Sequence, residues 1–142
     1  MKEFISQLAH EKIVAAIRDA EKKTSGEIRV FISKKNVADA VAAAQSEFDR
    51  LGMTRTQHRN GVLIYVAPAA RKFAVIGDTG VHEKCGQKFW DELAAEMGGH
   101  FAKTKFSDGI IHGIAHAGKI LAQHFPALPG DKNELPDKIE TD

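Results

Sequence analysis

The sequence predicts an α/β fold in which helices cover the faces of a mixed β-sheet. Segments with apolar residues at helical spacing alternate along the chain with short runs typical of β-strands. A connection long enough for a helical crossover favours a parallel pair of strands, and a later tight turn favours an antiparallel pair. With 142 residues, 43% of them hydrophobic, the chain can bury one core without disulfides or metals.

The N-terminal third reads as helix, strand, helix. Apolar residues at helical spacing over 13–20 predict the first helix, and Gly26 after it can take a left-handed cap conformation. The alternation of residues 28–32 is typical of a strand covered on one face. Asn36 suits the N-cap of a second helix over 37–51, whose apolar residues form one stripe.

The central strand is predicted at residues 61–66, where the sequence is almost continuously apolar. Such a run is typical of a strand buried on both faces. Pro68 and the small residues after it make a short turn into a third strand at 72–77. These two strands are therefore expected to form an antiparallel hairpin.

Two long helices and a tail complete the chain. The first helix has apolar residues at steps of four over 81–101, with the glycines at 98–99 expected to loosen its last turns. The second is expected to start at 107–108, which offers capping side chains. We expect one α/β domain at residues 1–126 and an acidic, proline-containing tail at 127–142 that runs over the surface.

Strand polarity predicts that three polar loops meet at one edge of the sheet. If the strands at 28–32 and 61–66 are parallel, both start at the same edge, and the hairpin brings the end of the third strand there. The three loops are residues 24–27, 58–61 and 77–80.

These loops supply Glu27, Asn60 and Asp78, together with hydroxyl groups and glycines. Carboxylate, amide and carbonyl oxygens are ligands that Ca²⁺ and Mg²⁺ prefer. The sequence is therefore consistent with a divalent-metal site formed by these three residues, for Ca²⁺ or Mg²⁺. The alternative is that Asp78 and Asn60 only hydrogen-bond the backbone of their turns, as Asx residues do beside glycine.

Composition and charge argue against several function classes. Twenty basic and nineteen acidic side chains give a formal charge of +1, so no global field attracts nucleic acid or an anionic membrane. No run is apolar enough to span a bilayer, and the N-terminus lacks an export-signal pattern. We expect a cytoplasmic protein with no nucleic-acid partner and no direct membrane insertion. Cys85 is expected to be a small apolar residue of a helix.

Two other motifs are weaker. Asp78-Thr79-Gly80 matches the triplet of aspartic proteases, but those enzymes need two such aspartates and an all-β fold. His112 and His116 stand four residues apart on a predicted helix, which would suit a shared metal ion, but the glutamate of an HExxH motif is missing. We interpret them as two histidines on the polar face of an amphipathic helix.

Several short motifs, taken in order, resemble the TPM-domain family. They are AEKKTSGEIRV at 20–30, LGM at 51–53, RNGVLIYV at 59–66, RKFAVIGDTG at 71–80, the FW pair at 89–90 and HFP at 124–126. The resemblance extends from about residue 10 to about residue 139, and the end of the chain is similar to that of stand-alone, soluble bacterial members. It implies an αβα sandwich with a mixed sheet of about four strands, against the three strands recognised above.

The resemblance also implies divalent metal bound near crossing loops, which is carried over to Glu27, Asn60 and Asp78. We expect a metal-binding regulatory or interaction domain in which the ion braces the loops and a protein partner responds. Because acid phosphatase activity is attributed to some plant members, the alternative is a metal-assisted phosphomonoesterase at the same site. In a third interpretation the domain mediates protein contacts and the loops serve stability alone.

Overall fold

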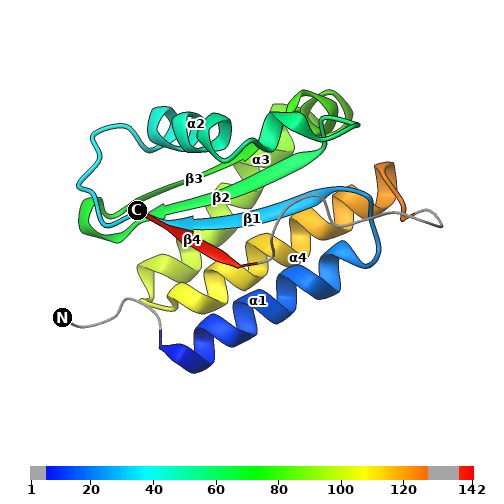
Figure 1. The fold of residues 1–142 in the computed structure, drawn as a ribbon. Helices are drawn as coiled ribbons and strands as arrows, with labels where there is room; N and C mark the ends of the chain where they lie inside the picture. Colours follow the sequence, from blue (N-terminus) through cyan, green and yellow to red (C-terminus); the bar gives the residue numbers. More distant parts are fainter. Residues whose placement is uncertain (1–5, 128–137) are drawn as a thin grey trace.

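The fold is a three-layer αβα sandwich (Figure 1). The computed structural model describes residues 6–127 and 138–142. Helix α2 covers one face of the sheet, and α1, α3 and α4 cover the other. The described elements are α1 (Gln7–Glu21), β1 (Glu27–Ile32), α2 (Ala40–Arg50), η1 (Met53–Arg55), β2 (Gly61–Ala67), η2 (Pro68–Ala70), β3 (Lys72–Gly77), α3 (Thr79–Ala102), α4 (Phe106–His124) and β4 (Ile139–Thr141). The predicted sandwich with a mixed sheet of about four strands is confirmed.

The strands lie in the order β3-β2-β1-β4. β1 runs parallel to β2, as the helical crossover through α2 predicts, and β2 and β3 form the predicted antiparallel hairpin. These pairings bring the start of β1, the start of β2 and the end of β3 to one edge of the sheet.

The fourth strand comes from the tail. Residues 139–141 pair in parallel with β1 (Figure 1). The Ile139 side chain is only 9% exposed. The expectation that the whole tail runs over the surface is therefore wrong for these residues, while positions 128–137 lie outside the described part of the chain. A buried apolar side chain and ladder hydrogen bonds hold the segment on the edge of β1.

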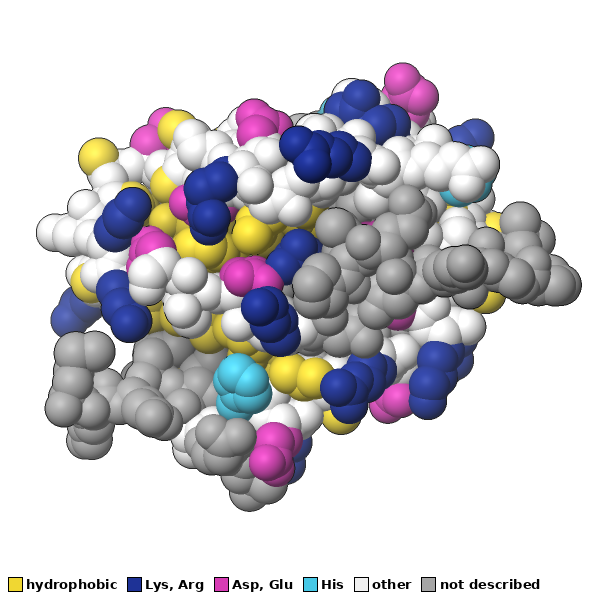
Figure 2. Space-filling model, in the orientation of Figure 1, with side chains coloured by type: hydrophobic (Ala, Val, Ile, Leu, Met, Phe, Trp, Pro, Cys, Tyr) yellow, Lys and Arg dark blue, Asp and Glu magenta, His cyan; other side chains and the backbone are white. Residues whose placement is uncertain are grey.

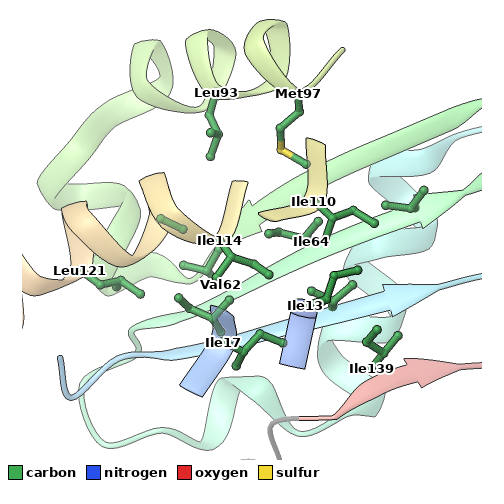
Figure 3. Close-up of a cluster of buried hydrophobic side chains, with 14 of the residues drawn as sticks. Ile13, Ile17, Val62, Ile64, Leu93, Met97, Ile110, Ile114, Leu121 and Ile139 are labelled. Atoms are coloured by element: carbon green, nitrogen blue, oxygen red, sulfur yellow. The ribbon is translucent and has the colours of Figure 1, made fainter. Parts of the chain in front are cut away.

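The larger hydrophobic core lies between the sheet and the three helices on one face (Figure 3). Every element of this side contributes to it. Its fully buried members include Ile13, Ile17, Val62, Ile64, Met97, Ile110, Ile114 and Leu121. Cys85 packs against the same core, and burial raises the pKa of its thiol, so this cysteine is not an activated nucleophile.

A second core lies between the sheet and α2. Phe31 and Tyr65 stack there with ring centroids 5.6 Å apart, and Phe48 of α2 packs against the same cluster. Both faces of β1 are therefore buried, and the expectation of a strand covered on one face is wrong. Arg29 lies on this strand at 4% exposure because its guanidinium pairs with Glu140 of β4.

The ends of the first two helices differ from the sequence-based expectation. α1 ends at Glu21, well before Gly26, and Gly26 has no left-handed backbone. α2 begins at Ala40, because Asp39 rather than Asn36 supplies the cap: an Asp39 carboxylate oxygen accepts a hydrogen bond from the Ala42 N–H at 3.1 Å.

The last two helices also differ in detail. The break in α3 occurs at Gly86, with φ of 74°, and not at the glycines 98–99, which remain helical. α4 starts at Phe106 without a side-chain cap. On the face seen in Figure 2, basic and acidic side chains are interspersed and no field of one sign forms.

Candidate functional site

The three predicted loops meet at one end of the sheet, which we call the sheet rim (residues 24–27, 58–61 and 77–80). Glu27 lies opposite Gly61 in the β1–β2 register, and its N–H donates to the Asn60 carbonyl at 3.3 Å. The Asp78 N–H donates to the Gly61 carbonyl at 2.9 Å. The main chains of Glu27, Asn60 and Asp78 are thus neighbours around the start of β2.

All three candidate side chains are buried, with exposures of 2% for Glu27, 1% for Asn60 and 5% for Asp78. Asn60 donates from its amide nitrogen to the Ser25 hydroxyl at 3.3 Å. Its side-chain oxygen is buried and accepts no hydrogen bond from the described residues. A buried acceptor without a partner costs about 1–3 kcal/mol, so this oxygen is suited to a cation or another donor.

Asp78 has two structural roles. It is the N-cap of α3, where one carboxylate oxygen accepts from the Thr79 N–H at 2.7 Å. Arg59 binds the same carboxylate in bidentate fashion, from Nε at 2.7 Å and Nη2 at 2.8 Å. This pairing raises the pKa of the Arg59 guanidinium. Arg59 is 47% exposed, so it can move into solvent if a cation takes its place.

The loop before β1 is fastened to the end of α4. The Thr24 hydroxyl donates to the Phe125 carbonyl, and the Ser25 N–H donates to the same carbonyl at 3.0 Å. The Gly26 N–H in turn donates to the Thr24 hydroxyl oxygen at 3.0 Å. Thr24 is therefore occupied within the protein and serves to position Glu27.

Close approach of main chains gives the rim its shape. A Cβ on Gly80 would lie 2.3 Å from the His58 carbonyl oxygen and 2.7 Å from that of Arg59. The Gly80 N–H donates to the Arg59 carbonyl at 2.9 Å. The first turn of α3 therefore rests directly on the loop before β2, and glycine is needed there for space.

The structure also brings together a cluster that the sequence interpretation missed. Glu96 of α3 and His112 and His116 of α4 have ligand atoms that all lie within 4.8 Å of one another. Within residues 6–127 and 138–142, these three side chains form a group of histidines and an acid close enough together to hold one metal ion. The spacing of the two histidines was visible in the sequence, whereas Glu96, sixteen residues before His112, carried no signal.

Fold and rim together define a small αβα domain with a mixed sheet and a buried polar edge. The chain belongs to the TPM-domain family, because the model of the TPM domain matches residues 1–120. No curated protein sequence matches the chain. Among the residues that the structure describes, no helix combines the length and apolarity needed to cross a bilayer.

Solved structures share the fold of this chain. The NMR structure of the BA42 protein from the psychrophilic bacterium Bizionia argentinensis has a TM-score of 0.91 at 39% identity, covering 100% of this chain and 98% of that one. N-terminal domains of proteins from P. gingivalis (TM-score 0.70, 15% identity, 88% and 83% covered) and Corynebacterium glutamicum (0.64, 19%, 82% and 74%) share the fold.

Proposed function

We propose that this TPM domain is a divalent-cation-binding regulatory or interaction module whose ion sits at the sheet rim. Glu27, Asn60 and Asp78 would hold the ion. The observation that carries the proposal is the buried Asn60 side-chain oxygen, which accepts no hydrogen bond from the described residues. The main chain of its loop is hydrogen-bonded to those of Glu27 and Asp78, whose side chains are also buried. A hard cation would satisfy that oxygen and neutralise the acidic side chains.

Ca²⁺ suits this donor set better than Mg²⁺. The three candidates come from three different loops, and Ca²⁺ accepts six to eight oxygens in irregular geometry, whereas Mg²⁺ demands a nearly ideal octahedron. A bound cation supplies positive charge that bridges the loops. Further oxygen ligands would have to come from main-chain carbonyls or water.

The ion pair between Arg59 and Asp78 provides a route from binding to regulation. Both donors of Arg59 lie on the Asp78 carboxylate, so cation and guanidinium compete for the same oxygens. Binding of the cation would release the half-exposed Arg59 to solvent. The surface offered to a protein partner then gains one free arginine side chain. Its guanidinium could bind a carboxylate of the partner.

Calcium titration of chelator-stripped protein, followed through backbone amide NMR signals, tests this proposal. We expect saturable shifts at residues 25–27, 59–61 and 77–80. Asp78→Asn keeps a capping side chain but loses the charge, and should weaken Ca²⁺ binding by about tenfold or more. Arg59→Gln removes the competitor and should strengthen it.

Asp91→Asn, a change of an exposed acid on α3 whose side chain accepts a hydrogen bond from Gln87, is the matched control and should leave the affinity unchanged. Absence of any rim response at millimolar Ca²⁺ contradicts the proposal, as does equal affinity in Asp78→Asn.

Partner capture with and without chelator then separates cation-dependent regulation from a purely structural rim. Recovery in the cytosolic fraction after lysis checks the proposed cytoplasmic location.

A metal-assisted phosphomonoesterase at the same rim is the second candidate. The observation that favours it is Arg59, a half-exposed guanidinium in a polar rim, because such groups bind phosphate in bidentate fashion. Of the possible proton donors nearby, His82 is engaged, since its Nδ1 accepts from the Trp90 indole N–H at 3.1 Å. Equal p-nitrophenyl phosphate turnover by wild type and Asp78→Ala would count against catalysis.

A further inference from the structure

Four titratable side chains face one another across the pair of helices α3 and α4. Glu96 and His100 are four residues apart on α3, and His112 and His116 are four residues apart on α4. Residues at this spacing lie on the same face of a helix. The His112 ring centroid is 4.2 Å from that of His116 and 5.2 Å from that of His100.

The distances suit a metal ion of tetrahedral preference. His112 Nε2 lies 3.1 Å from a Glu96 carboxylate oxygen, and the ligand atoms of Glu96, His112 and His116 all lie within 4.8 Å of one another. Nitrogen and oxygen ligands on one tetrahedral Zn²⁺ ion are about 3.3–3.6 Å apart. To bind one ion, ligand atoms at separations of up to 4.8 Å would have to move closer to that spacing.

Exposure leaves room for an ion to enter. The Glu96 side chain is 45% exposed and that of His112 26% exposed, while His116 is half-buried. All three ligands lie on helices, Glu96 on α3 and the two histidines on α4, so they are held on rigid elements. The open side leaves the fourth coordination position to water or to another ligand.

The state of the ligands also fits. The hydrogen bond from His112 lowers the pKa of the Glu96 carboxyl against the opposing effect of desolvation, and a glutamate carboxyl of ordinary pKa is already an anion at neutral pH. One hydrogen bond between Glu96 and His112 accounts for those two residues. It does not account for the position of His116, whose ring lies against His112 and points a third ligand atom to the same place.

We propose that Glu96, His112 and His116 form a zinc site that joins α3 to α4. It is separate from the sheet rim and has a different chemistry, since imidazole nitrogen with one carboxylate suits Zn²⁺, whereas the rim offers oxygen alone. The stretch of α3 from Gly86 to Glu96 alone spans about 15 Å, and Asp78 lies beyond it. Bound zinc would fasten the last turns of α3, which contain Gly98 and Gly99, to α4.

Calorimetric titration of chelator-stripped protein with Zn²⁺ near pH 7.5, in the presence of Ca²⁺, tests the site. We expect one Zn²⁺ ion per chain. Glu96→Gln and the double variant His112→Gln/His116→Gln should each weaken binding more than about tenfold, because even the loss of an outer-shell partner costs 10–100-fold. His124→Gln is the matched control, as it changes a histidine of the same helix outside the cluster.

A second readout guards against misfolded variants. Co²⁺ in place of Zn²⁺ should give the intense visible bands of a four-coordinate ion in wild type and in His124→Gln, and not in Glu96→Gln. The Glu96 side chain is 45% exposed, so its replacement by glutamine leaves the core intact. Zinc binding of unchanged affinity in the double variant, or no binding to wild type, overturns the proposal. The calcium response of the rim should be the same in Glu96→Gln, so failure of either site is distinguishable from failure of the other.

Discussion

Gly80 shows at the scale of one residue how tightly the rim is built. The Gly80→Ala change would place a methyl group 2.3 Å from the His58 carbonyl oxygen, which belongs to the main chain and cannot rotate away. The loop before β2 must then move off α3. We expect a loss of about 1–3 kcal/mol in the free energy of unfolding, measured by urea denaturation, together with weaker binding of Ca²⁺.

Gly99→Ala is the control for this change. Nothing lies within 4 Å of a Cβ on Gly99, which is an exposed residue inside α3. Alanine should therefore stabilise the protein by up to about 1 kcal/mol through helix propensity. Equal effects of the two substitutions would show that the contact at Gly80 carries no strain.

The sequence allowed the three rim residues to be placed together, but it did not reveal their partners. Strand polarity alone brings Glu27, Asn60 and Asp78 to one edge. The pairing of Arg59 with Asp78 depends on the left-handed backbone of Arg59, whose φ is 51°, and on the hairpin register. Neither property is encoded in local residue pattern, so the pairing of Arg59 with Asp78 could not be foreseen.

At the scale of elements, one ion pair contributes to the docking of β4 on β1. The buried Arg29 guanidinium contacts the Glu140 carboxylate through Nη2, and Arg29 Nε finds no acceptor within the described residues. Glu140→Ala should lower the free energy of unfolding by up to about 3 kcal/mol, the cost of an unpaired buried charge. Detachment of β4 from the sheet limits the loss, because Arg29 then regains water.

Thr141→Ala, an exposed change on the same strand, separates this effect from strand propensity and should cost less than about 0.5 kcal/mol. Thermal or urea unfolding of both variants provides the comparison. A Glu140→Ala protein as stable as Thr141→Ala would mean that the ion pair contributes nothing to the docking of β4.

Acid should release the same strand. Burial acts to raise the pKa of Asp142, but hydrogen bonds from the Lys34 N–H and the Ser33 hydroxyl outweigh it, so the pKa is lowered from 3.8. A carboxyl group with a lowered folded-state pKa stabilises the fold above its unfolded pKa. That contribution disappears as the pH falls below about 4 and through the folded pKa.

Amide hydrogen exchange at residues 139–141 measures this effect. We expect protection at pH 6 that is lost near pH 3 in wild type, after correction for intrinsic rates. In Asp142→Asn the protection should already be reduced at pH 6 and should change less with pH. A profile identical to that of wild type would assign the acid response to other groups, such as Glu140.

β4 was missed because its signal is too short. Three residues cannot show alternation, and they stand at the end of an acidic segment that reads as surface tail. The pairing partner, β1, lies about a hundred positions away in the sequence. By contrast, β2 was predictable because seven consecutive buried residues leave a continuous apolar run.

At the scale of the whole molecule, the lengths of the connections predicted the strand topology. They did not predict how closely α3 packs against α4. The parallel pair and the hairpin follow from the lengths of the segments that join the strands. The approach of α3 to α4 depends on glycines of α4: a Cβ on Gly113 would lie 2.7 Å from the Met97 sulfur. The cluster at Glu96 follows from that approach, which local pattern does not reveal.

The bend at Gly86 divides α3 into two helical segments that pack against different parts of the protein. The shorter segment follows the N-cap Asp78 and contacts the sheet rim, whereas the longer segment carries Glu96 and lies against α4. Since the helical backbone is interrupted between them, a tilt of the first segment need not move the second. A change in orientation of residues 79–85 therefore need not displace Glu96, so occupancy of one proposed cation site should leave the geometry of the other unaltered.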